Sequence, residues 1–222
     1  MSINKIGQNI VILLEKFLFL LDEDKPIHAL SEYSFLSTIE SNYLDIKTEI
    51  ENFSQVSFRN TEDLSAEQQR IVERNKWKTF FLRVAGKDIE RNAAYFPLTM
   101  KLLNEKSIKT VFFSIMEPNT HITPHRGVYK GFLRYHLGLI MPKEKNKTAI
   151  KIGDAIYYWE EGKAFLFDDT FEHEAWNKTN EQRIILLIDI ERKFTFPFNL
   201  LNKLILSLIS ISPLARGVYK KA

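Results

Sequence analysis

The 222-residue chain contains no cysteine, which excludes disulfide bonds and thiolate metal sites. Any metal must therefore be held by histidine, aspartate or glutamate. Net charge is also small: 31 Lys and Arg stand against 28 Asp and Glu, and a balance of +3 is too weak to indicate a nucleic-acid partner. We therefore expect no nucleic acid to bind.

Long apolar runs are missing as well. A membrane-spanning helix needs about 20 apolar residues, and no run in this sequence is that long. Two shorter runs lie near the ends, at residues 10–21 and 200–211. The first is interrupted by Glu15 and Lys16 and lacks the small-residue cleavage site of a signal peptide. Each run predicts either a helix packed on the core or a peripheral helix with its apolar face in lipid. The sequence leaves both alternatives open.

Apolar and aromatic residues are plentiful, at 45% and 13%, and suffice for the core of one large domain over residues 1–222. The periodicity divides it into a mostly helical front (1–108), an all-β core (109–192) and an apolar, basic helical tail (193–222). Within the front, apolar spacing and charge pattern predict helices at residues 10–21, 36–53, 65–75 and 87–106, the last around Pro97.

From Lys109 onward the pattern changes to short runs rich in β-branched and aromatic residues, bounded by Gly, Pro, Asn and Asp. The runs are KTVFFSIME, GFLRYHLGLIMP, TAIKIGDAIYYW, KAFLFD and RIILLIDIER. Five or more strands at such close spacing predict a mainly β fold, a sandwich or a barrel-like jelly roll.

One of these runs, LRYHLGL, carries an unusual polar face. Alternation along a strand places Arg134 and His136 on one side and the leucines on the other. On an outer strand that polar side would face solvent. Inside a jelly roll it would face the interior, where a buried charge needs a partner.

The histidines nearby do not form a helical zinc pair. His121 and His125 are spaced as HxxxH, but Pro124 and the β-branched residues before it disfavour a helix. We expect His125 instead at a strand end, just before Gly127.

The spacing of His125, His173 and Arg183 is more informative. His173 follows His125 by 48 residues, after the acidic turn FDDTFE, and Arg183 comes ten residues later. Jelly-roll oxygenases dependent on Fe(II) and 2-oxoglutarate share this layout, with two histidines and a carboxylate on the metal and an arginine on the cosubstrate. Their carboxylate normally stands two positions after the first histidine, where this chain has Gly127. Spacing alone therefore leaves open an oxygenase, a sugar-binding cupin-like module and a purely structural sandwich.

Four motifs resemble the aspartyl/asparaginyl β-hydroxylase family: FSIMEPNTHITPHRG, LRYHLGLIMP, WEEGKAFLFDDTFEHEAWN and RIILLIDIER. The similarity runs from about Trp77 to Arg192. It implies a double-stranded β-helix, a jelly roll of the cupin kind, and an iron site of two histidines without a carboxylate. Gly127 agrees with such a site. The implied cofactors are Fe(II), 2-oxoglutarate as cosubstrate and O2.

The resemblance also implies roles for single residues. It assigns the iron to His125 and His173. It implies that Ser114 and Arg183 bind the distal carboxylate of 2-oxoglutarate. Arg134 and His136 would contact the end nearer the iron.

Other polar residues receive no catalytic role from the resemblance. His121 is expected to be structural, and His28 has no assigned function. Asp168, Asp169 and Glu172 flank His173, and we expect them to make turn and supporting hydrogen bonds.

The family has two substrate branches: Asp or Asn side chains of polypeptides, and fatty acyl chains of bacterial membrane lipids. The stretches HRGVYKGFLRYHLGLIMP and FTFPFNLLNKLILSLI resemble the lipid branch, which includes lipid A 2-hydroxylases and ornithine-lipid hydroxylases. We therefore expect hydroxylation of an unactivated C–H on the acyl chain of lipid A or a similar lipid. The alternative is a β-hydroxylase acting on a polypeptide or a free amino acid.

The same resemblance bears on location. Lipid A enzymes of this type usually begin with clear membrane helices, whereas this chain has only residues 10–21. With no visible secretion signal and with cofactors of the cytosol, we expect a cytoplasmic protein or one held peripherally on the inner face of the membrane.

Overall fold

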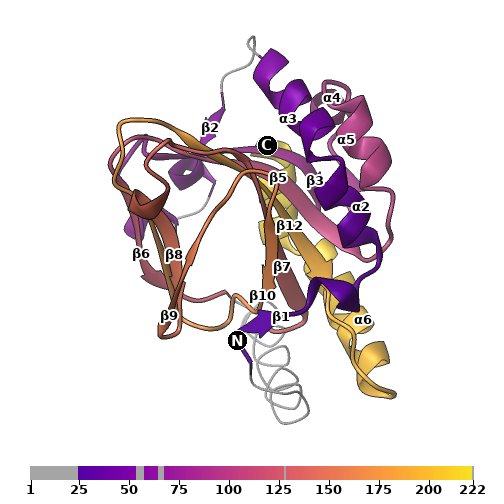
Figure 1. Ribbon diagram of the computed structural model, residues 1–222. Coiled ribbons are helices and arrows are strands. Elements are labelled where there is room, and N and C mark those ends of the chain that lie inside the picture. The colour runs from indigo at the N-terminus through magenta and orange to yellow at the C-terminus, as the bar shows by residue number, and fades with distance from the viewer. Residues whose placement is uncertain (1–24, 54–57, 65–67, 128, 222) are drawn as a thin grey trace.

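The computed structural model describes residues 25–53, 58–64, 68–127 and 129–221 (Figure 1). The helix predicted at residues 10–21 lies outside them. An eight-stranded sheet contains β1 (Ile27–His28), β2 (Arg59–Asn60), β3 (Trp77–Val84), β4 (Lys87–Asp88), β5 (Ile108–Met116), β7 (Phe132–Ile140), β10 (Ala164–Phe167) and β12 (Arg183–Glu191). A four-stranded sheet contains β6 (Thr120–His125), β8 (Thr148–Ile152), β9 (Ala155–Tyr158) and β11 (His173–Asn177).

From β5 to β12 the chain crosses repeatedly between these two sheets. The larger sheet has the order β1-β10-β7-β12-β5-β3-β2, with β4 on β3, and the smaller has the order β6-β11-β8-β9. The sheets face each other across a shared interior (Figure 1). This interleaving is a double-stranded β-helix, which confirms the predicted fold class.

The central strand β12 shows how the sequence sets both faces of the larger sheet. Its run RIILLIDIE is buried almost throughout, as expected for a strand covered on both sides. One set of alternating side chains, including Ile184 and Leu186, packs in the cluster shared with the helices. The other set includes Arg183 and Asp189 and faces the smaller sheet.

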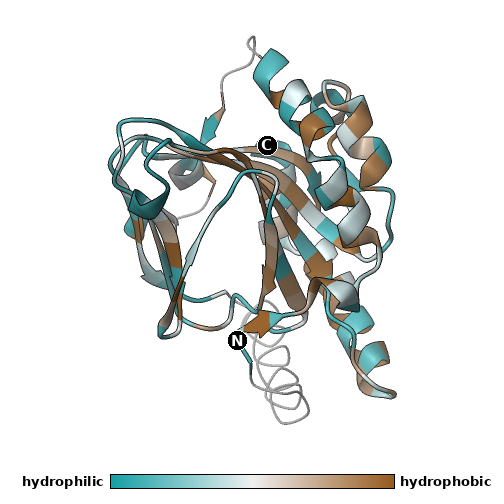
Figure 2. Ribbon diagram, in the orientation of Figure 1, coloured by the Kyte–Doolittle hydropathy of each residue, from teal (hydrophilic) through white to brown (hydrophobic). Residues whose placement is uncertain are grey.

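Helices cover the outer face of the larger sheet. They are α2 (Phe35–Ser41), α3 (Tyr43–Asn52), α4 (Glu90–Ala93) and α5 (Pro97–Leu102). The strands beneath them are largely apolar (Figure 2), and Leu36, Ile46 and Phe96 pack in one cluster with residues of these strands and are 0% exposed. The helix predicted at residues 36–53 is confirmed as α2 and α3. The one predicted at 87–106 is confirmed in part, because Lys87 and Asp88 belong to β4 and the helical residues divide into α4 and α5. Pro97 opens α5, because its missing N–H costs nothing at the first helical position.

The front is less helical than expected. Residues 59–88 contribute β2, β3 and β4, so the core sheet begins well before Lys109. Strand β3, WKTFFLRV, pairs with β5 along most of its length. Its aromatic residues are buried and fit a strand better than a helix.

The helix predicted at residues 65–75 is also absent from the described part of that segment. Only a 3-10 turn, Gln68–Arg70, occurs there. Val72 then bridges to Ile122, and the carbonyl of Ile71 accepts a hydrogen bond from the backbone N of Thr123 at 2.8 Å. Pairing with the edge of the smaller sheet thus overrides the local helical pattern.

The C-terminal tail is helical, as predicted, with α6 (Phe198–Ser210) and α7 (Pro213–Lys221). None of the helices in the described ranges is long and apolar enough to cross a bilayer by itself. Helix α6 and residues Ala215–Lys221 meet that length and composition only when added together across a 50° bend.

Candidate active site

Two histidines meet across the smaller sheet. His125 ends β6 and His173 begins β11, and the two residues are direct cross-strand partners. Their ring centroids lie 4.2 Å apart. Residues separated by 48 positions are thus brought together by strand pairing rather than by a loop.

A bulge in β6 sets the direction of His125. The pairing steps from Ile122 opposite Ala175 to His125 opposite His173, so β6 carries one residue more than β11 over this stretch. Thr123 and Pro124 are both exposed there. In a regular strand His121 and His125 would share a face. The extra residue instead leaves His121 outside and brings His125 beside His173, and proline is tolerated at a bulge because it has no N–H to donate.

Both histidines are held in the same tautomer. Nδ1 of His125 donates to the carbonyl oxygen of Thr123 at 2.8 Å, and Nδ1 of His173 donates to that of Phe171 at 2.9 Å. Each Nε2 therefore keeps a free lone pair, the form that binds metals. Burial lowers the pKa of His125, and burial together with His125 lowers the pKa of His173 to about 3. Both rings are neutral near pH 7.

A second group of polar side chains lies on β3, β5 and β12. Ser114 pairs in register with Thr79 on one side and Ile185 on the other. Its Oγ accepts a hydrogen bond from Nε1 of Trp77 at 2.9 Å. Arg183 reaches the same residue, with Nη1 3.3 Å from the carbonyl oxygen of Ser114 and 3.5 Å from its Oγ.

Arg183 is a buried cation that has no acidic partner among the residues that the structure describes. It is 2% exposed, its Nε has no hydrogen-bond partner, and its two contacts with Ser114 are long. Its guanidinium stacks on the ring of Trp159 at 4.5 Å. Burial lowers the pKa of Arg183 to about 9. A bound anion would offset this cost, because an opposite charge favours the charged form.

His136 presents another unused donor in the same interior. Nε1 of Trp159 donates to its Nδ1 at 3.3 Å, so the proton of the neutral ring sits on Nε2. Within the described part of the chain, that Nε2 is buried and has no hydrogen-bond partner. Burial, with Arg134 and Arg183 nearby, lowers the pKa of His136 well below its ordinary value. The ring is therefore a neutral hydrogen-bond donor.

Phe167 lies between His136, which neighbours Arg183, and the histidine pair. Its ring centroid lies 5.0 Å from that of His136 and 5.7 Å from that of His173. The cation, the neutral donor and the histidine pair therefore follow one another through continuous ring contacts. Aromatic walls of this kind keep water out of a polar site.

Arg134 shares the strand face of His136, as predicted, but it is already paired. Its Nε and Nη2 bind Asp189 at 2.8 and 3.2 Å, and its Nη1 lies 2.9 Å from Oδ2 of Asp169. Burial opposes the charge, but Asp169 and Asp189 outweigh it and raise the pKa of Arg134. Burial also raises the pKa of Asp169 to about 6, against the pull of Arg134. The predicted contact of Arg134 with a cosubstrate stays a prediction.

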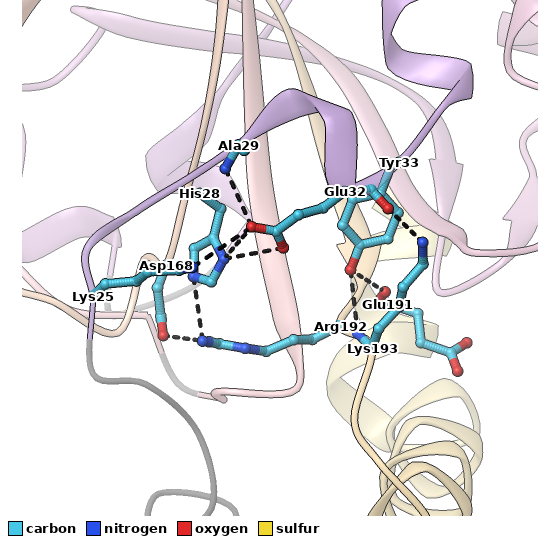
Figure 3. Close-up of polar contacts among 9 residues, drawn as sticks. All are labelled: Lys25, His28, Ala29, Glu32, Tyr33, Asp168, Glu191, Arg192 and Lys193. Carbon is cyan, nitrogen blue, oxygen red and sulfur yellow. Dashed lines mark hydrogen bonds and ion pairs between the residues drawn. The ribbon is translucent and has the colours of Figure 1, made fainter.

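The acidic turn before His173 is anchored from the N-terminal side (Figure 3). Asp168 is fully buried and forms an ion pair with Arg192. The second nitrogen of Arg192 donates to Nε2 of His28 at 3.3 Å, and Nδ1 of His28 donates to Glu32 at 3.2 Å. His28, which the sequence left without a role, thus ties β1 to the turn. Burial, and next Arg192, lower its pKa.

The remaining polar residues of the region lie outside the interior. His121 is about half exposed and binds Glu174 at 2.7 Å. Glu172 is 62% exposed in its side chain and lies 4.0 Å from Arg126. Trp77, Trp159 and Asp189 do contact the site. They received no role from the sequence, although Trp159 and Asp189 stand inside two of the family motifs.

Comparison with known proteins gives consistent matches. The family model described as aspartyl/asparaginyl beta-hydroxylase matches residues 40–193. An ornithine lipid ester-linked acyl 2-hydroxylase of Rhizobium tropici is 35% identical over 191 residues, covering 85% of this chain and 68% of that protein. The aspartyl/asparaginyl beta-hydroxylase of Mus musculus is 38% identical over 130 residues, 56% of this chain but 17% of that protein.

A solved structure with a similar arrangement is a prolyl-4-hydroxylase of Pseudomonas putida, with a TM-score of 0.46 and 10% identity. The match covers 70% of this chain and 88% of that one. The family match covers well over half of the chain and includes every residue of the histidine pair, the buried cation and the donor between them. The chain belongs to the aspartyl/asparaginyl β-hydroxylase family.

Proposed function

We propose that this protein is an Fe(II)- and 2-oxoglutarate-dependent dioxygenase that hydroxylates a fatty acyl chain of a membrane lipid. The observation that carries the proposal is Arg183, a buried cation that no acidic residue of the described ranges pairs with and that lies in the same interior as a neutral histidine pair. Such a cation is costly unless an anion binds it.

The histidine pair fits Fe(II). Two neutral imidazoles with their Nδ1 atoms bonded to backbone carbonyls are oriented ligands, and iron accepts imidazole nitrogen readily. Position 127 is glycine, so it offers no carboxylate as a third ligand. The remaining positions on the metal would be left to the cosubstrate, O2 and water.

The unused donors fit 2-oxoglutarate, which has a carboxylate at each end. Arg183 and Ser114 would hold the distal carboxylate, because a guanidinium fork matches a carboxylate and the hydroxyl adds a donor. Nε2 of His136 would donate to an oxygen nearer the metal. Arg134 would act on that end through the charge of its ion-paired guanidinium.

Bound Fe(II), with 2-oxoglutarate and O2, supplies the oxidant that turns C–H into C–OH, and the cosubstrate leaves as succinate and CO2. The chain itself binds and orients these groups. Trp159 stacks on Arg183 and fixes the proton of His136 on Nε2. Phe167 separates the two groups from water.

The lipid substrate is supported by the relative from Rhizobium tropici, whose name states an acyl 2-hydroxylase of an ornithine lipid. That relative is matched over 85% of this chain, whereas the mouse protein is matched over 56%. The match to the lipid hydroxylase therefore includes residues outside the part of this chain that the mouse protein matches. Lipid A and ornithine lipid are both within the proposed class.

The test is mass spectrometry of total lipids from a host without such an enzyme, with and without this protein. We expect one added oxygen atom on an acyl chain, lost in His125→Ala and kept in His121→Ala. The second variant is a matched control, because His121 lies on the same strand but faces outward.

Unchanged lipids would overturn the lipid assignment. Succinate formation that still depends on Fe(II) would then keep the oxygenase and move the substrate to a peptide or an amino acid. Failure of both measurements would overturn the proposal as a whole.

A further inference from the structure

Helix α6 packs on the segment that follows His125. Its Asn202 is fully buried, accepts a hydrogen bond from the hydroxyl of Tyr129 at 2.6 Å and donates to the carbonyl oxygens of Gly131 and Arg192 at 3.2 and 3.1 Å. Ile205 and Leu206 pack with Tyr129 on the same side. One face of α6 therefore makes its hydrogen bonds and apolar contacts within the protein.

The opposite face of α6 is apolar as well, yet it is exposed. Leu200, Leu204, Leu208 and Ile211 recur at intervals of four, four and three residues, which forms one stripe on a helix. Their exposed fractions are 56, 56, 43 and 54%, and the nearby Phe196 is 77% exposed. We call these five residues the α6 stripe. Contiguous apolar surface of this kind marks an interaction site.

Basic residues run beside the α6 stripe. A cleft of about 650 Å³ lies along the flank of α6, and four lysines line it: Lys106, Lys109, Lys193 and Lys203. Lys109 is paired with Glu191, and Lys193 donates to the carbonyl oxygen of Glu32 and lies 4.5 Å from the ring of Tyr33. Lys203 is exposed. Residues 193–222 contain five Lys and Arg (193, 203, 216, 220 and 221) and no Asp or Glu.

The α6 stripe and the basic residues beside it together indicate which kind of partner binds this surface. A protein surface that covered the stripe alone would not need a neighbouring tail, residues 193–222, with five basic and no acidic residues. An anionic membrane offers both an apolar layer for leucines and phenylalanine and phosphates for lysines. The helix lies at the edge of the fold, outside the two sheets (Figure 1), so its outer face is accessible to a flat surface.

We propose that α6 is an interfacial helix that docks this protein on anionic lipid. The α6 stripe enters the boundary between headgroups and acyl chains, and the lysine-lined cleft binds lipid phosphates. Only the thickness of one helix, about 10 Å, then separates the bilayer from the segment after His125. Docking by α6 does not require the chain to be a hydroxylase.

The experiment is co-sedimentation of the full chain with vesicles of phosphatidylcholine, with and without phosphatidylglycerol. The first variant is Leu204→Ser with Leu208→Ser. Its matched control is Leu44→Ser with Leu98→Ser, because those leucines are 59 and 49% exposed on α3 and α5. The second variant is Lys203→Glu, with Lys101→Glu on α5 as its control.

We expect binding to mixed vesicles that weakens at least tenfold in the double leucine variant. Lys203→Glu should weaken binding severalfold on mixed vesicles and leave pure phosphatidylcholine unaffected. Both controls should bind like the wild type. All substitutions are at exposed positions, so unchanged melting temperatures will show intact folds.

Two results would overturn the proposal. One is binding that the α6 variants leave unchanged, which would assign any membrane contact to another segment. The other is a concentration-dependent dimer, seen by sedimentation velocity and abolished by the leucine variant, without vesicle binding. The assay needs neither iron nor substrate, so its result is independent of the lipid hydroxylation test.

Discussion

The carboxylate of Asp169 fills the space that a side chain at position 127 would need. A Cβ placed on Gly127 would lie 2.2 Å from Oδ1 of Asp169. The backbone N of Gly127 also donates to the carbonyl oxygen of Asp169 at 2.7 Å, and Arg134 holds the carboxylate in place. The position from which a third ligand would extend is thus closed by a carboxylate from another segment.

A substitution at this position should therefore be costly for a steric reason. Gly127→Ala should lower the free energy of unfolding by about 1–3 kcal/mol, the usual cost of overpacking. Asp169→Ala should relieve the clash, so the double variant should be more stable than the sum of the two single effects. Urea unfolding of the four proteins measures the coupling. Simple additivity would show that the two positions do not compete for space.

The histidine pair should be indispensable for metal binding and turnover. His125→Ala and His173→Ala should each lose Fe(II)-dependent succinate formation by at least about 100-fold, because each removes one of two protein ligands. His121→Ala should retain activity, since its ring faces outward and binds Glu174. Metal affinity measured with Mn(II) on the same variants separates a lost ligand from a misfolded chain. Activity retained by either inner variant would remove that residue from the metal site.

Arg183 should stabilise the complex with 2-oxoglutarate and destabilise the protein that has no ligand bound. Arg183→Met should raise the 2-oxoglutarate requirement by about 100-fold or more, because a buried carboxylate loses its cationic partner. The same variant should be more stable than the wild type without ligand, by about 1–2 kcal/mol, since an uncompensated buried charge is removed. Urea unfolding with and without 2-oxoglutarate measures both effects. A less stable variant that still gains stability from 2-oxoglutarate would refute the assignment.

Stability should fall in mild acid because four histidines are held neutral. Burial lowers the pKa of His28, His125, His136 and His173, whereas in the unfolded chain these rings titrate near 6.5. The unfolded state therefore binds more protons below that pH. The stabilisation is present above about pH 6.5 and is lost as the pH falls, by at most about 1.4 kcal/mol per pH unit for each ring.

His28 allows this effect to be tested outside the proposed metal site. His28→Asn should reduce the fall in unfolding free energy between about pH 7 and about pH 5. The reduction will be smaller than the maximum, because Glu32 favours the charged ring. His121→Asn, at a half-exposed position, serves as the control. Equal pH slopes for the wild type and His28→Asn would contradict the prediction.

Much of the site was predictable because its residues follow strand alternation and motif spacing, which are visible in the sequence. Alternation along LRYHLGL placed Arg134 and His136 on one face, and the structure pairs them with Asp189 and Leu187 on the same side of β12. Motif spacing identified His125, His173 and Arg183, and the structure brings all three to one interior. Their roles in binding iron and 2-oxoglutarate stay predictions.

What could not be predicted depends on contacts between distant segments. Trp159 and Trp77 look like ordinary core aromatics in the sequence, and only the fold shows their N–H groups on His136 and Ser114. Strands β6 and β11 were not among the predicted runs, because THITPH and HEAWN are too short and polar to show a strand period. The N-terminal anchor at His28 rests on Arg192, more than 160 positions away.

The bulge in β6 has a consequence for how this protein tolerates mutation. Substitutions at Thr123 or Pro124 change the chemistry of two exposed residues but keep their number, so His125 still meets His173. Removal of either residue would take out the bulge and leave His125 two positions after Ile122, so regular pairing would still place it opposite His173. The pair therefore tolerates both an exchange of amino acids at these positions and the loss of one of them. An added residue would instead turn His125 to the outer face, since a shift of one residue exchanges the faces of a strand.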